Sequence, residues 1–210
     1  MNQALESRKE YTLGELEMSA MLESPIAQLK LWLEVAAQAN VIEPNAMTLS
    51  SVSANGRPSS RVVLLRGLDE QGLRFYTNYQ SRKGQELQTT GFACLNFWWG
   101  ALERQVRVEG AVQKVSSEES DVYFASRPYE SQLASAASPQ SQIITRSDLE
   151  EKVATLRLEF PDVVPRPAHW GGFRLEPDAF EFWQGRKARL HDRIRYDLES
   201  DAWVKMRLAP

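Results

Sequence analysis

Hydrophobic and polar residues alternate with a period of two along much of the chain after residue 46, which is the pattern of half-buried β-strands. The pattern predicts strands at residues 47–54, 61–66, 73–77, 92–99, 102–115, 170–175, 179–184, 189–196 and 202–208. Asn55-Gly56 follows the first of these segments and is a strong signal for a hairpin turn. Short turns also join the strands after it, so we expect the first five strands to form an antiparallel meander.

Helical spacing replaces this alternation in several places. Ser24-Pro25 combines a helix-capping residue with a proline suited to the first helical position, and the apolar residues Leu29, Trp32, Leu33 and Ala36 then fall on one face. Further helix starts are predicted at Ser81, at Ser116 with Glu119, and at Ser147 with Glu150. The last of these helices has an apolar stripe that we expect to face the core, formed by Leu149, Val153, Leu156 and Phe160.

The order of these elements predicts the fold class. At least six strands with short turns and a few peripheral helices indicate a mainly β protein, a Greek-key-like antiparallel barrel or split barrel. A chain of 210 residues can bury one substantial core, and we predict a single domain over residues 24–210. Residues 1–23 are polar with scattered apolar positions, so we expect a partly mobile N-terminal arm.

Composition excludes several classes of protein. The formal net charge of −3 argues against a nucleic-acid or membrane-surface partner, because such proteins usually carry a basic excess. Cys94 is the only cysteine and lies in an apolar run, which suits a buried thiol in a reducing compartment. The first residues lack the apolar segment of a signal peptide, so we expect a cytoplasmic location. With two histidines and one cysteine, no transition-metal site is expected.

Basic residues cluster locally in this acidic chain. The segment 189–193 reads Arg-Leu-His-Asp-Arg, and on a strand Arg189, His191 and Arg193 share one face. Such a row repels itself unless an anion lies across it, and an arginine fork suits phosphate or carboxylate oxygens. A solvated basic strand edge is the alternative, and these five residues alone slightly favour it.

Two further clusters favour phosphate binding. Arg82 and Lys83 begin a helix, where cations oppose the helix dipole unless an anion compensates them, although two solvated surface cations explain this motif equally well. Arg61 supports the anion site because an arginine at the start of an apolar strand is costly to bury unpaired. Arg127, with Tyr123 and Ser131 near it, forms the other cluster. The chain therefore has room for two phosphate groups.

Amide and aromatic side chains near these cations suggest a flat cofactor. Gln105 shares a strand face with Arg107, Gln140-Ser141 lies in a serine-rich loop, and Trp183 precedes the cationic row. Flavin mononucleotide (FMN) fits this set, because its ring takes hydrogen bonds at a polar rim and its tail requires a dianion site. The chain has no GxGxxG motif after a strand, so a Rossmann dinucleotide site is not indicated.

The chain resembles the pyridoxamine 5'-phosphate oxidase family over nearly its full length. The motifs that carry this resemblance are at 8–11, 61–66, 75–78, 81–83, 102–106, 123–128, 140–141, 170–173, 182–185, 189–193 and 207–210. The resemblance implies an FMN-binding split barrel that works as a homodimer with two FMN sites at the subunit interface. It also implies oxidation of the B6 vitamers pyridoxamine and pyridoxine 5'-phosphate to pyridoxal 5'-phosphate. In this reaction a hydride passes from substrate C4' to flavin N5, and O2 is reduced to hydrogen peroxide.

The family's site residues can be placed on this chain position by position. The resemblance implies cofactor contacts at Arg61, Val62, Val63, Leu64, Leu65, Arg66, Tyr76, Thr77, Arg82, Lys83, Gln105, Gln140, Ser141, Trp183 and Arg193. It implies substrate contacts at Arg8, Lys9, Glu10, Tyr11, Arg66, Tyr123, Arg127, Ser131, Arg189, Leu190 and His191, with residues 8–11 closing over the site. Of these, Arg189 and His191 are expected over the reacting carbon.

This chain departs from the family pattern at two places. Arg66 stands where the family commonly has lysine, and Ser135-Ala136-Ala137 lies where a tryptophan is common. Simple alternation also puts Arg61 and Arg66 on opposite faces, so either they serve different phosphates or a bulge intervenes. A reductase of the same fold with another substrate and a carrier of flavin or pyridoxal phosphate are the alternative functions.

Overall fold

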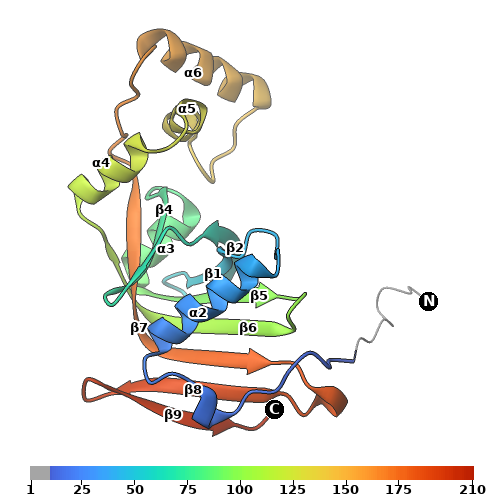
Figure 1. The fold of residues 1–210 in the computed structure, drawn as a ribbon. Coiled ribbons are helices and arrows are strands. Elements are labelled where there is room, and N and C mark those ends of the chain that lie inside the picture. Colours follow the sequence, from blue (N-terminus) through green and yellow to red (C-terminus); the bar gives the residue numbers. More distant parts are fainter. Residues whose placement is uncertain (1–9) are drawn as a thin grey trace. The chain divides into compact units, whose positions relative to one another are not determined.

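The structure is a computed structural model, and it describes residues 10–210 (Figure 1). The helices are η1 (Met18–Ala20), α2 (Pro25–Gln38), α3 (Arg82–Thr90), α4 (Ser117–Ala125), α5 (Tyr129–Ala137), α6 (Arg146–Glu159) and η2 (Lys187–Arg189). The strands are β1 (Ala46–Val52), β2 (Pro58–Leu64), β3 (Gly67–Asp69), β4 (Gly72–Asn78), β5 (Phe92–Trp99), β6 (Arg104–Lys114), β7 (Trp170–Gln184), β8 (Asp192–Glu199) and β9 (Ala202–Leu208). Within the described chain, no helix is long and apolar enough to span a membrane.

The described chain divides into two compact units. Of the described residues, unit 1 comprises 10–48, Cys94–Glu109 and Pro177–Pro210, and unit 2 comprises Leu49–Ala93 and Gly110–Glu176. Strands β1, β5, β6 and β7 each contribute to both units. The single domain over residues 24–210 stays a prediction.

The strands form a mainly antiparallel sheet in the order β2-β1-β5-β6-β7-β4-β3, with β8 paired to β7 and β9 paired to β8. The mainly β fold class is thus confirmed, but the simple meander is wrong because β4 pairs with β7 rather than with β5. Alternation along a strand determines which side chains share a face and says nothing about which strand lies beside it.

Strand β7 was expected as two strands and is continuous. Its first part pairs with β4, ending at Leu73↔Leu175, and its second part pairs with β8, beginning at Ala179↔Asp197. Pro177 lies between these two paired segments. A proline lacks a backbone N–H, so it fits a strand best where no such bond is needed.

Side-chain caps begin the helices at most of the predicted serines. Ser24 Oγ accepts from the Ala27 N–H, and Ser81 Oγ accepts from the Gly84 N–H. The predicted cap at Ser147 is wrong, because Thr145 Oγ1 accepts from the Asp148 N–H and α6 begins two residues earlier. Serine and threonine both make good caps, so spacing alone did not separate the two.

An aromatic cluster forms the centre of unit 1. The ring of Trp32 on α2 meets Phe182 edge-on at 5.2 Å and Trp99 at 6.4 Å between ring centroids. The guanidinium of Arg104 lies over the Trp32 ring, 4.4 Å from the ring centroid. These contacts explain why the predicted apolar face of α2 is buried.

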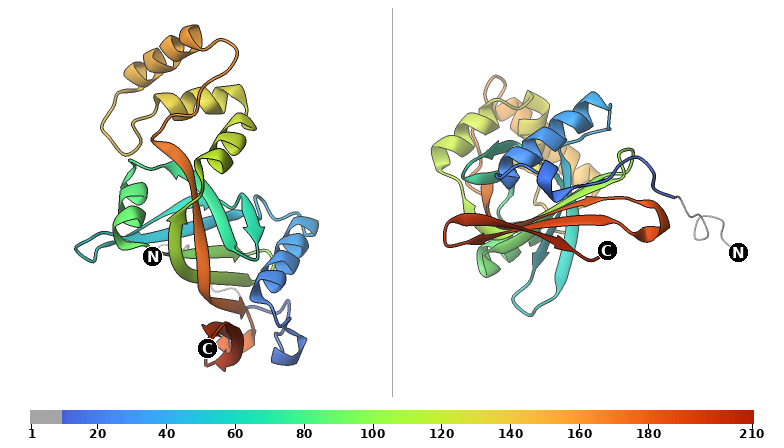
Figure 2. Two further views of the ribbon diagram at one scale, coloured as in Figure 1. Left: turned by 90° about the vertical axis from the view of Figure 1, so that its left-hand side faces the viewer. Right: turned by 60° about the horizontal axis from the view of Figure 1, so that its bottom comes forward.

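A second cluster in unit 2 contains the buried side chains of Phe124, Leu133, Val164 and Trp170. Helix α6 lies beside α5, as Figure 2 shows. Partly buried side chains of α6 pack against this cluster. The apolar stripe of α6 was expected to be part of the core. This expectation is only partly right, because the stripe packs against the cluster but no residue of α6 is fully buried.

We expect Gly84→Ala to destabilise unit 2. A Cβ at this position would lie 2.4 Å from the Tyr79 carbonyl oxygen and 2.6 Å from that of Asn78, and neither backbone atom can move freely. Overpacking of this kind costs about 1–3 kcal/mol of unfolding free energy. Chemical denaturation should show this loss, whereas Gln85→Ala, an exposed change on the same helix, should stay within about 0.5 kcal/mol of the wild type. Equal unfolding free energies for the two variants would contradict the expectation.

Candidate functional site

Unit 2 contains a cavity of about 650 Å³ with an unusual charge distribution. Its described lining includes four cationic side chains and no carboxylate. The lining residues are Arg61, Val62, Val63, Leu64, Arg66, Tyr76, Thr77, Asn78, Lys83, Tyr123, Arg127, Ser131, Ala134, Ser135, Ser138, Gln140 and Trp170. A concave surface with convergent cations and hydroxyl groups is suited to an anionic ligand.

The first pair of cations, Arg61 and Lys83, lies near the start of α3. Burial, followed by the neighbouring charge of Arg61, lowers the pKa of Lys83 to about 8. Lys83 Nζ donates to Gln140 Oε1 at 2.9 Å, and Thr77 Oγ1 donates to the same oxygen at 3.3 Å. These contacts gather ammonium, hydroxyl and amide groups at one end of the cavity.

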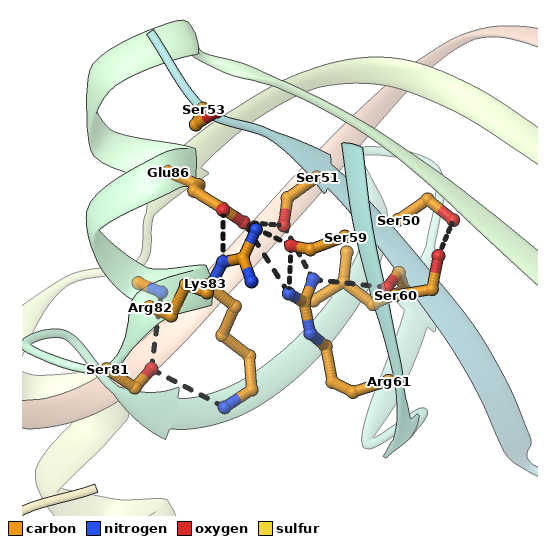
Figure 3. A network of polar contacts seen from close by, with 12 residues as sticks. Ser50, Ser51, Ser53, Ser59, Ser60, Arg61, Ser81, Arg82, Lys83 and Glu86 are labelled. Atoms are coloured by element: carbon orange, nitrogen blue, oxygen red, sulfur yellow. Dashed lines mark hydrogen bonds and ion pairs between the residues drawn. The ribbon is translucent and has the colours of Figure 1, made fainter. Parts of the chain in front are cut away.

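Glu86 on α3 forms an ion pair with Arg61, as Figure 3 shows. Its carboxylate accepts from Ser51 Oγ and Ser59 Oγ at 2.6 Å each and from Arg82 Nε at 2.8 Å, and it lies 3.5 Å from Arg61 Nη2. Burial opposes ionisation of Glu86, but the hydrogen bonds outweigh burial and lower its pKa to about 2. Glu86 is therefore an anion at all ordinary pH values.

The second pair of cations is Arg66 and Arg127. Burial lowers the pKa of Arg127, and the charge of Arg66 contributes to this shift. The Arg127 guanidinium lies 4.7 Å from the Trp170 ring centroid and donates from Nη1 to Ser135 Oγ at 2.7 Å. Cation–π contact and hydrogen bonding thus hold Arg127 in one orientation without a carboxylate.

A stack of aromatic rings stands beside this pair. Tyr76 and Tyr123 stack at 3.8 Å between ring centroids, and Trp170 is nearly parallel to Tyr123 at 6.2 Å. Burial, followed by the charge of Glu119, raises the pKa of Tyr76 to about 12, so its hydroxyl keeps its proton. The stack gives the cavity a rigid apolar wall between its polar groups.

Most predicted residues of unit 2 meet at this cavity. The predicted contacts that line it are Arg61, Val62, Val63, Leu64, Arg66, Tyr76, Thr77, Lys83, Tyr123, Arg127, Ser131 and Gln140. Three others do not line it: Leu65 is buried, the Arg82 side chain turns to Glu86, and Ser141 Oγ accepts from the Arg82 N–H at 3.1 Å.

Arg61 and Arg66 line the same cavity, although alternation put them on opposite faces. Strand β2 ends at Leu64, so alternation does not extend to Arg66. The Arg66 N–H instead donates to the Arg74 carbonyl at 2.8 Å as the chain turns into β3. The end of the strand explains the arrangement.

Three predicted residues of unit 1, Tyr11, Trp183 and His191, lie close together. Tyr11 lies 5.6 Å from both Trp183 and His191, and Trp183 lies 4.8 Å from His191, between ring centroids. The Arg186 N–H donates to His191 Nδ1 at 3.1 Å, which leaves Nε2 to carry the proton of the neutral ring. Burial, then the charge of Arg189, lowers the pKa of His191.

The prediction that residues 189–193 form one strand is wrong. Strand β8 begins at Asp192, whereas Arg189 ends η2 with a φ of 62°. A left-handed residue cannot continue the alternation of a strand, so Arg189 and Arg193 do not form one row. Leu190 is exposed, and Arg193 donates to the buried carboxylate of Glu181 at 3.0 Å.

The other predicted residues of unit 1 have simpler positions. Gln105 and Arg107 share the less buried face of β6, as alternation indicated. Glu10 is exposed. Arg8 and Lys9 lie outside the described residues.

The sequence reasoning missed several carboxylates that orient these groups. Glu86 had a signal, because it follows Arg82 by four residues on one helix and i,i+4 pairs of opposite charge commonly interact. Glu103, Glu181 and Asp192 are buried acidic residues, and each bonds at least one group from a distant part of the sequence, which no local pattern contains.

Solved structures share this fold. PhzG from Burkholderia lata 383, in complex with tetrahydrophenazine-1-carboxylic acid, is 34% identical with a TM-score of 0.90, and the match covers 96% of this chain and 100% of PhzG. A pyridoxamine 5'-phosphate oxidase-related, FMN binding protein from Nostoc punctiforme PCC 73102 is 19% identical with a TM-score of 0.72, covering 90% of this chain and 100% of the other. The predicted split-barrel fold is thereby confirmed.

Sequence comparison identifies the family. The family model described as pyridoxamine 5'-phosphate oxidase matches residues 33–157, and the model described as the pyridoxine 5'-phosphate oxidase C-terminal dimerisation region matches residues 170–210. Proteins named pyridoxine/pyridoxamine 5'-phosphate oxidase from Cupriavidus pinatubonensis and Methylibium petroleiphilum are 52% and 53% identical, covering 100% and 97% of this chain and 100% and 96% of their own. The chain therefore belongs to the pyridoxamine 5'-phosphate oxidase family.

Proposed function

We propose that this protein is an FMN-dependent oxidase that converts pyridoxamine 5'-phosphate and pyridoxine 5'-phosphate to pyridoxal 5'-phosphate, with O2 reduced to hydrogen peroxide. This reaction belongs to vitamin B6 biosynthesis and salvage. The observation that carries the proposal is the cavity of unit 2, whose described lining holds four cations and no carboxylate. Two phosphate-bearing ligands, cofactor and substrate, account for two pairs of cations.

The Arg61–Lys83 end fits the phosphate of FMN. A phosphate has three terminal oxygens to satisfy, and this end offers a guanidinium, an ammonium and the Thr77 hydroxyl. The lowered pKa of Lys83 suits this role, because an anion beside the ammonium would offset both its burial and its repulsion from Arg61. Gln140 and the aromatic Tyr76 supply the polar and flat contacts that a flavin ring requires.

The Arg66–Arg127 end fits the phosphate of the substrate. Tyr123 and Ser131 add hydroxyl donors beside Arg127, and the guanidinium fork can bind two phosphate oxygens at once. Because Ser135 and Trp170 already orient Arg127, little side-chain entropy is lost on binding.

Bound FMN supplies the chemistry by accepting a hydride from the substrate C4' carbon. The chain's own residues orient the substrate: Arg127 holds its phosphate, and His191 and Arg189 are proposed to lie over the reacting carbon. The lowered pKa of His191 favours the neutral ring, and because Nδ1 accepts from the Arg186 N–H, Nε2 carries the proton and can donate. It can therefore hydrogen-bond a substrate oxygen or nitrogen without adding a charge.

A homodimer with FMN at the subunit interface completes the proposal. The family model that covers residues 170–210 is described as a dimerisation region. Trp183, His191 and Arg193, which are proposed to contact cofactor or substrate, belong to that region. The residues that line the cavity belong to unit 2. A site shared between subunits is compatible with this division.

Oxidase activity can be tested directly. Purified protein supplied with FMN and pyridoxine 5'-phosphate in air should produce hydrogen peroxide and pyridoxal 5'-phosphate in equal amounts. A reductase of the same fold would leave this substrate unchanged, and a carrier would bind it without turnover. Absence of peroxide with both phosphorylated vitamers would refute the proposal.

The affinity of the apoprotein for FMN should depend on the charge of Lys83. A phosphate monoester is a dianion above its second pKa of about 6, so in alkaline solution Lys83 is the titrating group. Lys83 is protonated below its pKa of about 8 and loses its charge above it. The FMN dissociation constant should therefore be constant from pH 7 to 8 and rise by up to about tenfold per pH unit above that.

Fluorescence titration measures this dependence, and two controls separate the phosphate from the ring. Lys83→Arg should remove the rise, because arginine keeps its charge throughout this range. Riboflavin, which lacks the phosphate, should bind with little change between pH 7 and 9.5. A flat FMN profile in the wild type would show that Lys83 does not contact the phosphate.

Replacement of Arg127 should affect the substrate and spare the cofactor. Arg127→Ala removes a charge-assisted phosphate contact, so the KM for pyridoxine 5'-phosphate should rise about 10- to 100-fold while the FMN dissociation constant stays unchanged. Arg157→Ala, which removes an exposed arginine paired with Glu130 on α5, is the matched control and should leave both constants at wild-type values. A selective loss of FMN affinity in Arg127→Ala would reverse the two phosphate assignments.

A further inference from the structure

Two buried carboxylates of unit 1 bind the backbone of the chain's N-terminal part. Glu103 and Asp192 are 1% and 3% exposed. Glu103 Oε2 accepts from the N–H groups of Thr12 and Leu13 at 2.8 and 3.0 Å, and Asp192 Oδ2 accepts from the Leu16 N–H at 2.9 Å. Hydrogen bonds to an ionised acceptor are stronger than neutral ones, so each carboxylate is a substantial anchor.

The turn that carries Glu103 is held in a costly conformation. Glu103 has a φ of 54°, which side chains other than glycine rarely adopt. Its carbonyl accepts from the Gly185 N–H at 2.8 Å and from Gln184 Nε2 at 3.2 Å. The buried amide of Gln184 and the neighbouring backbone thus fix the turn, and the glutamate side chain is directed to residues 12 and 13.

Tyr11, the residue before this docked segment, packs tightly on the same unit. Its ring lies edge-on to Trp183 and near His191, at 5.6 Å from each. Gly185 leaves room for it, because a Cβ there would lie 2.6 Å from Tyr11 Cγ and 2.8 Å from its Cβ. The position of Tyr11 beside His191 therefore depends on the backbone that follows it and on the absence of a side chain at residue 185.

We propose that Glu103 is a positioning residue that, together with Asp192, docks residues 11–16 so that Tyr11 is held against His191. The inference rests on the proposed function in one respect, namely that His191 contacts substrate. Glu103 touches neither substrate nor cofactor in this assignment, and it acts through Tyr11.

Surface ion pairs do not provide the same anchoring. Arg186 Nη2 lies 3.1 Å from Glu15 Oε1, but Glu15 is 67% exposed in its side chain, and such pairs contribute little. The buried carboxylates differ because water does not compete for them. Glu15→Gln is therefore a matched control that removes an acidic contact of the same segment without disturbing its backbone bonds.

Hydrogen–deuterium exchange of the apoprotein tests the docking without any activity measurement. Glu103→Gly removes the carboxylate and suits the positive φ, so the turn itself should be retained. We expect the amides of Thr12 and Leu13 to exchange at least about tenfold faster than in the wild type, while amides of β8 and β9 are unchanged. Glu15→Gln should exchange like the wild type. Unchanged rates at residues 12 and 13 in Glu103→Gly would overturn the inference, as would equal acceleration throughout unit 1.

Steady-state kinetics with pyridoxine 5'-phosphate tests the action through Tyr11. Glu103→Gly should raise the KM about tenfold with a smaller change in kcat, since loosening the segment lowers the population of the binding-competent arrangement. Gly185→Ala, which displaces Tyr11 and leaves both carboxylates in place, should have the same effect. In a Tyr11→Ala background, Glu103→Gly should produce no further rise.

The two kinds of measurement separate the possible failures. Absence of oxidase activity in the wild type refutes the proposed function, and the exchange rates still decide whether Glu103 docks the segment. If the effects of Glu103→Gly and Tyr11→Ala on KM multiply, Glu103 does not act through Tyr11 and the positioning role is refuted.

Discussion

Repulsion among like charges is the constraint on which the site of unit 2 depends. Four cations line one cavity, and in each pair burial together with the charge of the neighbour lowers the pKa of one member: Arg61 adds to the shift of Lys83, and Arg66 to that of Arg127. An arginine keeps its proton under such pressure, whereas a lysine can lose it near neutral pH. Glu86 orients Arg61, and Ser135 and Trp170 orient Arg127, before any ligand binds. An anion that enters the cavity would reduce the repulsion among the four cations.

The protein places its counter-charges behind the cations rather than in the cavity. Glu86 binds Arg61 and Arg82 from the side of α3, and in unit 1 Glu181 binds Arg107 and Arg193 in the same manner. This arrangement orients the guanidinium groups and leaves the cavity lining free of carboxylates that would repel phosphate. Breaking such a partly buried pair leaves an uncompensated charge, so these acidic residues are constrained as strongly as the cations they orient.

Local patterns predicted the elements better than the contacts between them. Alternation located most strands, and the capping rules located Ser24, Ser81 and Ser116, because both depend on residues close in sequence. The pairing of β4 with β7 and the buried anchors Glu103 and Asp192 depend on residues about 90 or more positions apart, which no local pattern contains. Arg189 was misplaced for another reason: Ala188 and Arg189 both have positive φ before β8 begins, and neither is a glycine that would have indicated this.

Arg66 shows how the end of a strand can determine the chemistry of a site. Because β2 stops at Leu64, Arg66 reaches the cavity that also contains Arg61, and its backbone is fixed by the bond to Arg74. Arg66 is exposed, so its guanidinium can stay hydrated. A buried guanidinium would instead require a counter-ion. A fork at the exposed edge and the oriented fork of Arg127 can then approach one phosphate from two directions. An arginine at this position is therefore compatible with a phosphate ligand, because the space for its guanidinium lies at the solvent-facing edge.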